Sequence, residues 1–415
     1  MTWKRALSLL AVVVVSFSWG FLSYRHQLFP YLLIRDTANK LGLVYKTAEE
    51  KPRTQRLDLV KSLPYAHATF DPRHEESGVV SSTDRTQAGY NFYNAWQDSN
   101  AYLTDIQGNV LHTWSRDFRD RDWHHVELLP GGDILVVLRG DGVAKLDKDS
   151  KLVWYYATPA HHGVFVSGTG EIFVITGEEA LLPEVHPTLP SFCDKIAVLS
   201  PDGRLLQEFS LLDAVRNSPY RNLLPSFAQD SFPKEITTLD ILHTNHIEVF
   251  DGSLDHLSKL YKRGNMLISL RHMNAIAILD GDSREIVWLW GPTNVYAQHH
   301  PRLLENGNIL LFDNGTSSSR VIEVEPATGR IAWKYENGPA FFSEWGGSVQ
   351  RLANGNTLIT NSGSGRAFEV TAEGKIAWEF ANPKVYSNGN RANIWRLTRF
   401  QGNEPGFPLD LVSKR

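Results

Sequence analysis

Sulfur is scarce in this sequence: its 415 residues include one cysteine, Cys193, and three methionines. A single cysteine excludes an intramolecular disulfide and any zinc site built from several thiolates. Neither sign of charge dominates, because 42 Lys and Arg residues oppose 46 Asp and Glu residues and leave a formal net charge of −4. A slightly acidic chain has no electrostatic reason to bind nucleic acid, and we expect no such partner.

Glycine (31 residues), proline (20 residues) and charged residues (21%) are close to globular averages. Collagen-like, low-complexity and largely disordered classes are therefore excluded. The chain contains neither a Gly-x-x-x-x-Gly-Lys loop nor a Rossmann fingerprint, so a nucleotide has no recognisable cradle. Aromatic residues are what the chain has in excess, with 12 Trp, 14 Tyr and 20 Phe.

The longest apolar run lies at the N-terminus. Lys4 and Arg5 precede an apolar stretch of about 17 residues, 6–22, which is at the lower edge of a membrane span. No small-x-small cleavage site follows it, so residues 1–25 are predicted to be an uncleaved signal anchor, with a cleaved signal peptide as the alternative. We expect a juxtamembrane helix and linker over residues 26–88. The remaining chain would then be extracytoplasmic, on the periplasmic side of the inner membrane in a Gram-negative cell.

From about Gly89 onward, a unit of four short runs rich in Val, Ile and Leu recurs. The unit is clearest in residues 300–333 and 348–378, where Asn-Gly joins the first two runs and a glycine-containing turn joins the last two. It recurs less cleanly from His125, near Gly163 and from His246. Tryptophans end several units at spacings of 45 and 40 residues: Trp288, Trp333 and Trp378, and Trp114 and Trp154.

Four-stranded propeller blades run about 40–50 residues, which these spacings match. We therefore predict an all-β fold, a six-bladed β-propeller over residues 89–405. The sixth blade is expected to draw outer strands from residues 101–114 and its first strand from residues 393–400, so that both ends of the chain close the ring. Two insertions, 178–193 and 211–238, interrupt the repeat, and loops of that length are commonly functional.

Polar side chains gather where the first strand of a unit begins and where its second strand ends. These two positions lie at the same face of a propeller, because the second strand returns antiparallel to the first. Nine of the 15 histidines fall there, with other polar residues. The full set is His124, His125, His161, His162, His243, His246, His272, His299 and His300, with Asn245, Arg139, Arg271, Asp313 and Asn314. We expect the set to converge on one mouth of the central channel.

Three interpretations fit such a set of residues. Polar residues in a wet channel need no chemistry, which leaves a non-catalytic, membrane-anchored scaffold as one possibility. His243, His246, His124 and His299 have the side chains to ligate zinc or copper, but no Asp or Glu falls at their register, the start of a first strand, and we expect no metal. Imidazoles beside one arginine suit transfer of an anionic group, since neutral His is a nucleophile or base and Arg271 offers a planar fork to a tetrahedral oxyanion.

Four short stretches resemble motifs of the bacterial arylsulfate sulfotransferase family. His243-Thr-Asn245-His246-Ile is similar to the family's His-x-Asn-x-Ile strand. Met266-Leu-Ile-Ser-Leu-Arg271 resembles the strand that ends in its sulfuryl-binding arginine, and Gln298-His299 resembles the start of the strand with its nucleophilic histidine. Asp122-Trp-His124-His125 resembles the region of its fourth active-site histidine.

The resemblance implies that a sulfuryl group moves from an aryl sulfate to a phenolic acceptor by a ping-pong route, with no nucleotide donor and no cofactor. His299 would attack sulfur and form a sulfohistidine, and His243 would assist proton transfer to the phenols. Sulfuryl oxygens would be stabilised by Arg271, His124 and Asn245. Further substrate contacts are expected from His246, His300 and Asn314. His243 and His246 compete for one role, as do His299 and His300.

A quinoprotein-like propeller is the alternative enzyme class. Residues 325–333, Glu-Pro-Ala-Thr-Gly-Arg-Ile-Ala-Trp, also resemble the tryptophan-docking repeat of pyrroloquinoline quinone enzymes. That motif is structural, because its tryptophan packs between blades. The adjacent cysteines that often support this cofactor are absent, and the sequence shows no acidic metal cluster.

Overall fold

The computed structural model describes residues 68–95, 98–118, 123–229, 231–232 and 236–412. The predicted signal anchor, residues 1–25, lies outside these ranges, as does most of the predicted linker. Within them, no helix combines the length and the apolar character needed to cross a membrane.

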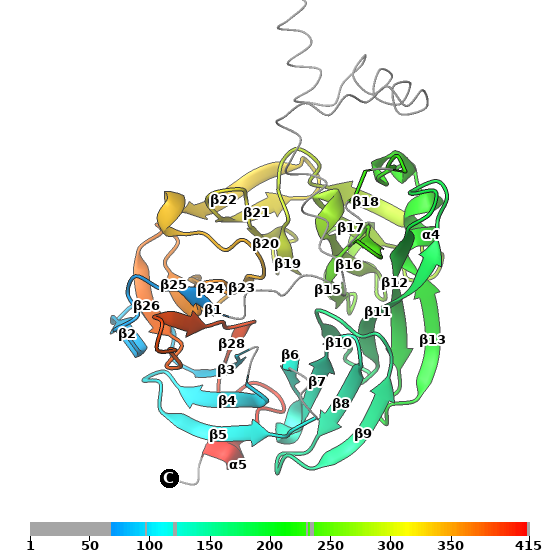
Figure 1. Ribbon diagram of the computed structural model, residues 1–415. Coiled ribbons are helices and arrows are strands. Elements are labelled where there is room, and N and C mark those ends of the chain that lie inside the picture. Colours follow the sequence, from blue (N-terminus) through cyan, green and yellow to red (C-terminus); the bar gives the residue numbers. More distant parts are fainter. Residues whose placement is uncertain (1–67, 96–97, 119–122, 230, 233–235, 413–415) are drawn as a thin grey trace, which may run out of the picture.

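The described residues form six antiparallel sheets arranged as blades around a common centre, which confirms the predicted six-bladed propeller (Figure 1). Blade 1 consists of β6 (Trp123–Leu128), β7 (Ile134–Leu138), β8 (Gly142–Leu146) and β9 (Leu152–Ala157). Blade 2 consists of β10 (Val164–Val166), β11 (Ile172–Leu181), β12 (Pro190–Leu199) and β13 (Leu205–Ser210), with β14 (Leu239–Asp240) beside β12. Blade 3 consists of β15 (Thr244–Val249), β16 (Met266–Leu270), β17 (Ala275–Leu279) and β18 (Ile286–Trp290).

The remaining blades complete the ring. Blade 4 consists of β19 (His299–Leu303), β20 (Ile309–Asp313), β21 (Arg320–Glu325) and β22 (Arg330–Glu336). Blade 5 consists of β23 (Ser348–Arg351), β24 (Thr357–Asn361), β25 (Arg366–Val370) and β26 (Ile376–Ala381), with β2 (Gly78–Ser82) outside β26. Blade 6 consists of β28 (Leu397–Phe400), β3 (Tyr90–Asn94), β4 (Asn100–Asp105) and β5 (Val110–Ser115).

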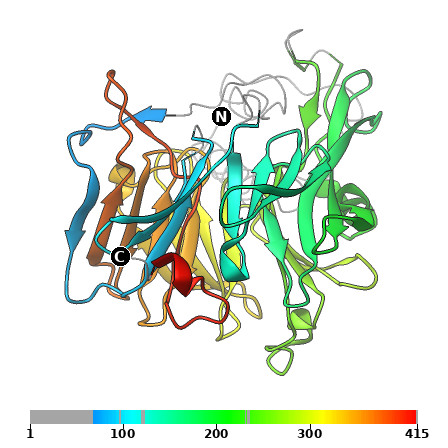
Figure 2. The same cartoon turned by 90° about the horizontal axis from the view of Figure 1, so that it is seen from below.

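Short helices lie in the connections. They are α4 (Leu211–Arg216) and α5 (Leu409–Val412), and the 3₁₀ turns η1 (Pro130–Gly132), η2 (Arg221–Leu223), η3 (Lys259–Tyr261), η4 (Arg271–Met273) and η5 (Gly338–Ala340). Helix α5, red in Figure 2, packs against β5 near the C-terminus.

Burial explains why the inner strands read as unbroken apolar runs. Every residue of β7, β16, β20 and β24 is buried, because each of these strands is covered on both faces by neighbouring blades. The outermost strands differ: β9 and β13 contain no fully buried residue. The core is accordingly divided among layers between blades, such as the cluster of Leu135, Val137, Val174 and Ala197 between blades 1 and 2.

Tryptophans on outer strands link five of the six blades to the next. Trp154 Nε1 donates to the Pro201 carbonyl of blade 2 at 3.1 Å, and Trp333 Nε1 donates to the Ala372 carbonyl of blade 5 at 2.9 Å. The same kind of bond is made by Trp114, Trp288 and Trp378. The resemblance of residues 325–333 to a tryptophan-docking repeat is therefore structural, because Trp333 packs its blade against the next. Blade 2 ends in Phe209 instead, and Arg284 of blade 3 lies over its ring at 4.3 Å.

The ring closes where the sequence predicted, with one strand more than expected. β28 is the innermost strand of blade 6, and β4 and β5 are its outer strands. The second strand is β3, which pairs with both β28 and β4. The predicted blade lacked this strand because Tyr90–Asn94, Tyr-Asn-Phe-Tyr-Asn, contains no Val, Ile or Leu. Arg399 of β28 bonds Asn91 Oδ1 at 2.9 Å and forms a fully buried ion pair with Glu369 of blade 5.

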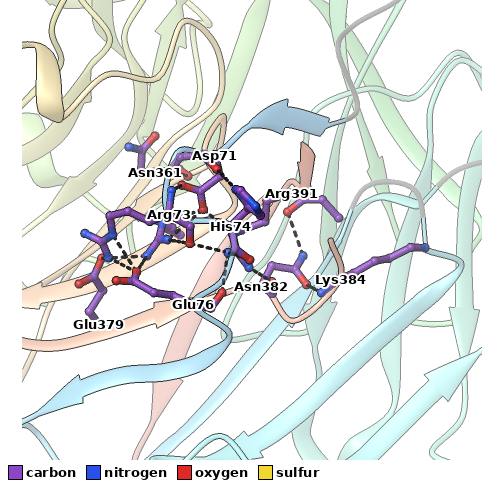
Figure 3. A network of polar contacts seen from close by, with 12 residues as sticks. Asp71, Arg73, His74, Glu76, Asn361, Glu379, Asn382, Lys384 and Arg391 are labelled. Atoms are coloured by element: carbon purple, nitrogen blue, oxygen red, sulfur yellow. Dashed lines mark hydrogen bonds and ion pairs between the residues drawn. The ribbon is translucent and has the colours of Figure 1, made fainter. Parts of the chain in front are cut away.

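Part of the expected linker belongs to the propeller. β1 (Ala68–Phe70) pairs with β27 (Asn390–Ala392), and β2 pairs with β26. Between them, Asp71 accepts hydrogen bonds from Arg391 Nε at 2.7 Å and from Arg366 Nη2 at 2.9 Å (Figure 3). Two buried guanidinium groups on one buried carboxylate fix this segment against blade 5. Residues 68–82 are therefore structural and not a solvated spacer.

Blade 2 departs most from the repeat. The insertion at 178–193 lengthens β11 and β12 to ten residues each. The insertion at 211–238 begins with α4, whose Ser210 side chain caps the helix by accepting from Asp213 N. It leads into β14, which pairs in parallel with β12 through Leu239 and Asp240. The second insertion is thus followed by a two-residue strand that extends the sheet beside β12.

Candidate active site

Three inner strands carry β-bulges where their histidines lie. In β6 the pairing skips His124, and in β15 it skips Asn245. In β19 the residues between His299 and Arg302 oppose a single residue of β20. A bulge leaves extra residues out of the ladder and redirects their side chains, and bulges are frequent beside active sites. Blades 1, 3 and 4 thus each have a β-bulge near the start of the innermost strand.

Backbone strain concentrates in the same place. His162, His243 and His300 adopt φ of 58°, 50° and 50°. Residues other than glycine enter this left-handed region at a cost of about 1–3 kcal/mol each, and such strain clusters at functional sites. The surrounding structure holds these three backbones where unconstrained histidines would not stay.

One group of rings from blades 1 to 4 is here called the first histidine cluster: His124, His161, His162, His243, His272 and His299. The first five are joined by ring contacts, and His299 interacts electrostatically with His162 and His272. His162 N donates to His124 Nδ1 at 3.0 Å, so the neutral His124 ring carries its proton on Nε2. Ring centroids of His162 and His243 lie 4.5 Å apart, and those of His243 and His272 lie 4.6 Å apart. Trp395, just before β28, packs on His124 at 4.2 Å.

His299 is oriented by Asn314. The Asn314 amide nitrogen donates to the carbonyls of Ser343 and Gly346 at 2.8 and 2.7 Å, which fixes its Oδ1 toward His299 Nδ1, 2.7 Å away. An amide oxygen only accepts, so His299 Nδ1 holds the proton and Nε2 keeps its lone pair. His300 has the opposite tautomer, because its Nδ1 accepts from Val349 N at 3.1 Å. The two adjacent histidines are thus distinguishable as nucleophiles.

Arg271 lies directly after β16, at the start of η4. Its backbone N donates to the His243 carbonyl at 3.3 Å, and its Nη1 lies 2.9 Å from His272 Nε2. The side chain is buried beside the first cluster. Asn245, also predicted for the site, donates from Nδ2 to the Gln298 carbonyl at 2.8 Å and so ties the bulge of β15 to the residue before His299.

Burial keeps these imidazoles neutral. Desolvation, reinforced by the charge of Arg271, lowers the pKa of His299 to about 3. Burial likewise lowers the pKa of His124, His162 and His243 well below the ordinary value, with further lowering by neighbouring histidines and arginines. At neutral pH the first cluster is therefore a set of uncharged rings beside the guanidinium groups of Arg139 and Arg271.

A second group, the second histidine cluster, contains His125, His246 and His300 with Arg396 and Glu127. His125 Nε2 lies 3.2 Å from Glu127 Oε2 and 3.4 Å from Arg396 Nη1. The rings of His246 and His300 are 4.7 Å apart, and Arg396 contributes to the lowered pKa of both. The nine histidines thus fall into two groups with different neighbours, and the groups still interact electrostatically, as between His246 and His299. His246 and His300 lie near Arg396, whereas His243 and His299 lie near Arg271. These surroundings favour His243 and His299 for the roles that each pair shared in the sequence analysis.

Asp240 is the site residue that the sequence pattern missed. The sequence pattern places no Asp or Glu at the register of the histidines, yet Asp240 bonds the Nδ1 atom of His243. A second carboxylate, Asp194 Oδ1, lies 3.5 Å from His161 Nε2. Ligand atoms of Asp240, His243 and His272 lie within 4.8 Å of one another, a combination suited to a metal ion. Hydrogen bonds, however, already involve these atoms: His272 Nδ1 lies 2.7 Å from the Asp240 carbonyl and its Nε2 bonds Arg271. The contacts fit a hydrogen-bonded network better than a metal site.

A cavity of about 840 Å³ opens beside the first cluster, between blades 1 and 2. Its lining includes Arg139, Pro159, His161 and Phe192. His161 belongs to both the cavity and the cluster, and its Nδ1 lies 2.8 Å from His162 Nδ1. The elongated β11 and β12 supply Glu178, Glu179, Phe192 and Lys195 to the wall. The cavity thus combines apolar contacts from Pro159 and Phe192 with cationic groups on Arg139 and Lys195 and the carboxylates of Glu178, Glu179 and Glu208.

Solved structures show only distant likenesses. The chain is similar to a protein of unknown function from Bacteroides caccae (12% identity, covering 76% of this chain and 99% of that chain, TM-score 0.49). It is also similar to a streptogramin B lyase (13% identity, 82% and 95% coverage, TM-score 0.47). Similarity at this level carries no information about activity.

A family model is more informative. No curated protein matches the sequence. The model described as "Arylsulfotransferase (ASST)" matches residues 125–383, which is more than half of the chain. That stretch spans blades 1 to 5 and includes Asp240, His243, Arg271 and His299. The chain therefore belongs to the arylsulfotransferase family.

Proposed function

We propose that the protein transfers a sulfuryl group from an aryl sulfate to a phenol through a sulfohistidine on His299, without a nucleotide donor. The observation that carries the proposal is the bond from His299 Nδ1 to Asn314 Oδ1, 2.7 Å, which leaves a lone pair on Nε2 of a buried neutral ring. Such a ring is a competent nucleophile at neutral pH. Membership of the arylsulfotransferase family supports the reaction class.

In the first half-reaction, His299 Nε2 attacks sulfur and the bond from sulfur to the aryl oxygen breaks, which releases the donor as a phenolate. Arg271 binds the sulfuryl oxygens with its fork of donors. His124 adds a donor, since its proton is on Nε2. In the second half-reaction, the acceptor phenol gives its proton to His243 and attacks sulfur, and His299 leaves as a neutral imidazole. The proton on His243 then passes to solvent or to the next leaving phenolate.

The aryl groups occupy the cavity between blades 1 and 2. Its Phe192 and Pro159 offer apolar contact, and His161 and Arg139 connect it to the first cluster. The charge of Arg139 contributes to the lowered pKa of His124 and His162, which places it close to both rings. His246 and His300 belong to the second cluster, and in this proposal neither side chain bonds the sulfuryl group.

A transfer assay tests the function. The purified protein is given 4-nitrophenyl sulfate with and without phenol, and both nitrophenol release and phenyl sulfate formation are measured. We expect steady-state release to depend on the acceptor and to be matched by phenyl sulfate. Release matched by inorganic sulfate would indicate a sulfatase, and no release from any aryl sulfate tested would remove the proposed reaction.

We also propose that the propeller acts outside the cytoplasm, tethered to the membrane. The basis is the charged and apolar pattern of residues 4–22. Protease treatment of spheroplasts tests it: cleavage of a C-terminal tag from intact spheroplasts is expected, and protection until lysis would contradict it.

A further inference from the structure

The region around His243 contains a carboxylate outside every repeat unit. Asp240 is the second residue of β14, the two-residue strand that follows the insertion at 211–238. It pairs with Phe192 of β12, and it is 4% exposed. Because β14 runs parallel to β12, Asp240 is held by blade 2, whereas His243 leads into blade 3. The carboxylate thus contacts a residue three positions further along the chain, where β14 of blade 2 leads into β15 of blade 3.

Both oxygens of this carboxylate contact the same residue. Asp240 Oδ1 accepts from His243 N at 3.0 Å, and Oδ2 bonds the Nδ1 atom of the same histidine. The first bond holds a backbone with φ of 50°, and the second holds the ring. Since an ionised carboxylate only accepts, Nδ1 carries the proton and Nε2 is left as a basic nitrogen. One side chain therefore sets both the position and the tautomer of His243.

The surroundings of His243 make this contact necessary for proton transfer. His162, His272 and Arg271 all disfavour a positive charge on the ring, and burial disfavours it most. A proton taken from a phenol would make His243 an imidazolium beside the guanidinium of Arg271. A carboxylate in hydrogen-bond contact offsets that repulsion as the charge forms. His272 in turn holds Asp240 through its backbone carbonyl.

We propose that Asp240 is a positioning residue that enables His243 to accept the proton of the acceptor phenol. The proposal rests on the proposed function and assigns Asp240 to one half of it. In that half the phenol O–H bond breaks, the proton goes to His243 Nε2, and the new phenolate oxygen bonds sulfur as the bond from sulfur to His299 breaks. The donor half with 4-nitrophenyl sulfate needs no proton, because nitrophenolate is a stable leaving group.

The two halves can be measured separately. Rapid mixing of enzyme with 4-nitrophenyl sulfate alone reports the donor half as a burst of nitrophenolate, and steady-state turnover with excess phenol reports the acceptor half. For Asp240→Asn we expect a burst within about threefold of wild type and an acceptor half slowed by about 10²–10⁴, where the upper limit is the effect of losing such a carboxylate behind a catalytic histidine. Asp240→Glu, which keeps the charge, should recover part of the rate.

Two further variants make the result specific. In a His243→Ala background, Asp240→Asn should cause no additional loss, because residues that act as one unit are not additive. Asp71→Asn, which removes an equally buried carboxylate from blade 5, should leave both halves unchanged. Thermal unfolding of each variant separates loss of folding from loss of proton transfer.

Each contrary outcome has a distinct meaning. If wild type shows no burst, the proposed function fails before Asp240 is tested. If wild type turns over but Asp240→Asn slows both halves equally, or adds to His243→Ala, the positioning role is wrong. Stoichiometric zinc or copper in wild type, lost together with activity in Asp240→Asn, would make Asp240 a metal ligand and would also overturn the proposal.

Discussion

Both histidine clusters are built from histidines near the start of the innermost strands, but the residues around these histidines differ. In the first cluster, His299 and His243 are oriented by Asn314 and Asp240, so that each ring presents a basic Nε2. In the second, His125 and Arg396 are grouped with the carboxylate of Glu127, so the charges are balanced within the cluster. The bonding partner, and not the position along the strand, determines what a buried histidine is able to do.

The largest expected effect comes from breaking the first cluster at its nucleophile. His299→Ala removes the only group proposed to bond sulfur, and we expect loss of the burst and a fall in turnover of about 10⁴ or more. The measurement is nitrophenolate release in rapid mixing and at steady state. The matched variant is His300→Ala, one residue away in the second cluster, which should keep the burst. Equal losses in both variants would erase the distinction between the clusters.

Arg271→Lys tests the oxyanion site of the first cluster. Lysine keeps the charge but loses the planar fork, so we expect kcat/KM to fall by about 10²–10³. The fall should be mostly in kcat, because charge on the sulfuryl oxygens is redistributed in the transition state. The corresponding change in the second cluster, Arg396→Lys, provides the control and should alter kcat/KM by less than about tenfold. A fall confined to KM in Arg271→Lys would count against transition-state stabilisation.

Acid should destabilise both clusters, since both bury neutral histidines. Burial lowers the pKa of His125 to about 4 and those of His161 and His299 to about 3. In the unfolded chain these groups bind protons below about pH 6.5, whereas the folded state binds them only near pH 3–4. The unfolding free energy should therefore fall as pH drops from about 6.5 toward 4. Urea unfolding at pH 7.5 and 5.0 measures this, and equal midpoints would contradict it.

The smallest effect is expected at His246. Its ring lies against His300 and near Arg396, so His246→Gln should change turnover by less than about fivefold, with a stability loss of about 1–3 kcal/mol for a disturbed buried polar group. Turnover and urea unfolding of the same sample give both numbers. A loss of turnover as large as that of Arg271→Lys would move His246 into the catalytic group.

Much of the fold follows from pattern because propeller blades repeat. Trp333 and Trp378 recur at a fixed spacing since each donates to a turn of the next blade, and that bond requires the same position in every unit. The final strand, β28, was predictable because a ring of blades has one edge left to cover. β3 was not, since Tyr90–Asn94 pairs by backbone hydrogen bonds and lacks the aliphatic run by which strands are recognised.

The site, like the fold, was predictable where the repeat determines it and not elsewhere. His124, His243, Arg271 and His299 were predictable because the register of a blade determines where its strand ends meet. Asp240 was not, because it lies just after an insertion, outside the strand ends that the repeat defines, although it is only three residues before His243 and contacts it through a local turn. The division of the histidines into two clusters also depends on bulges and on φ values that composition does not reveal.

The central claim is that sulfur bonds to His299 during turnover. Incubation with a ³⁵S-labelled aryl sulfate in the absence of acceptor, alkaline quenching, digestion and peptide mapping test it directly. Label on the peptide that contains His299, absent from His299→Ala and discharged when phenol is added before quenching, is the predicted result. Sustained transfer to phenol with no label on any peptide, or with label that fragmentation assigns to His300 or to another histidine of the second cluster, would contradict it.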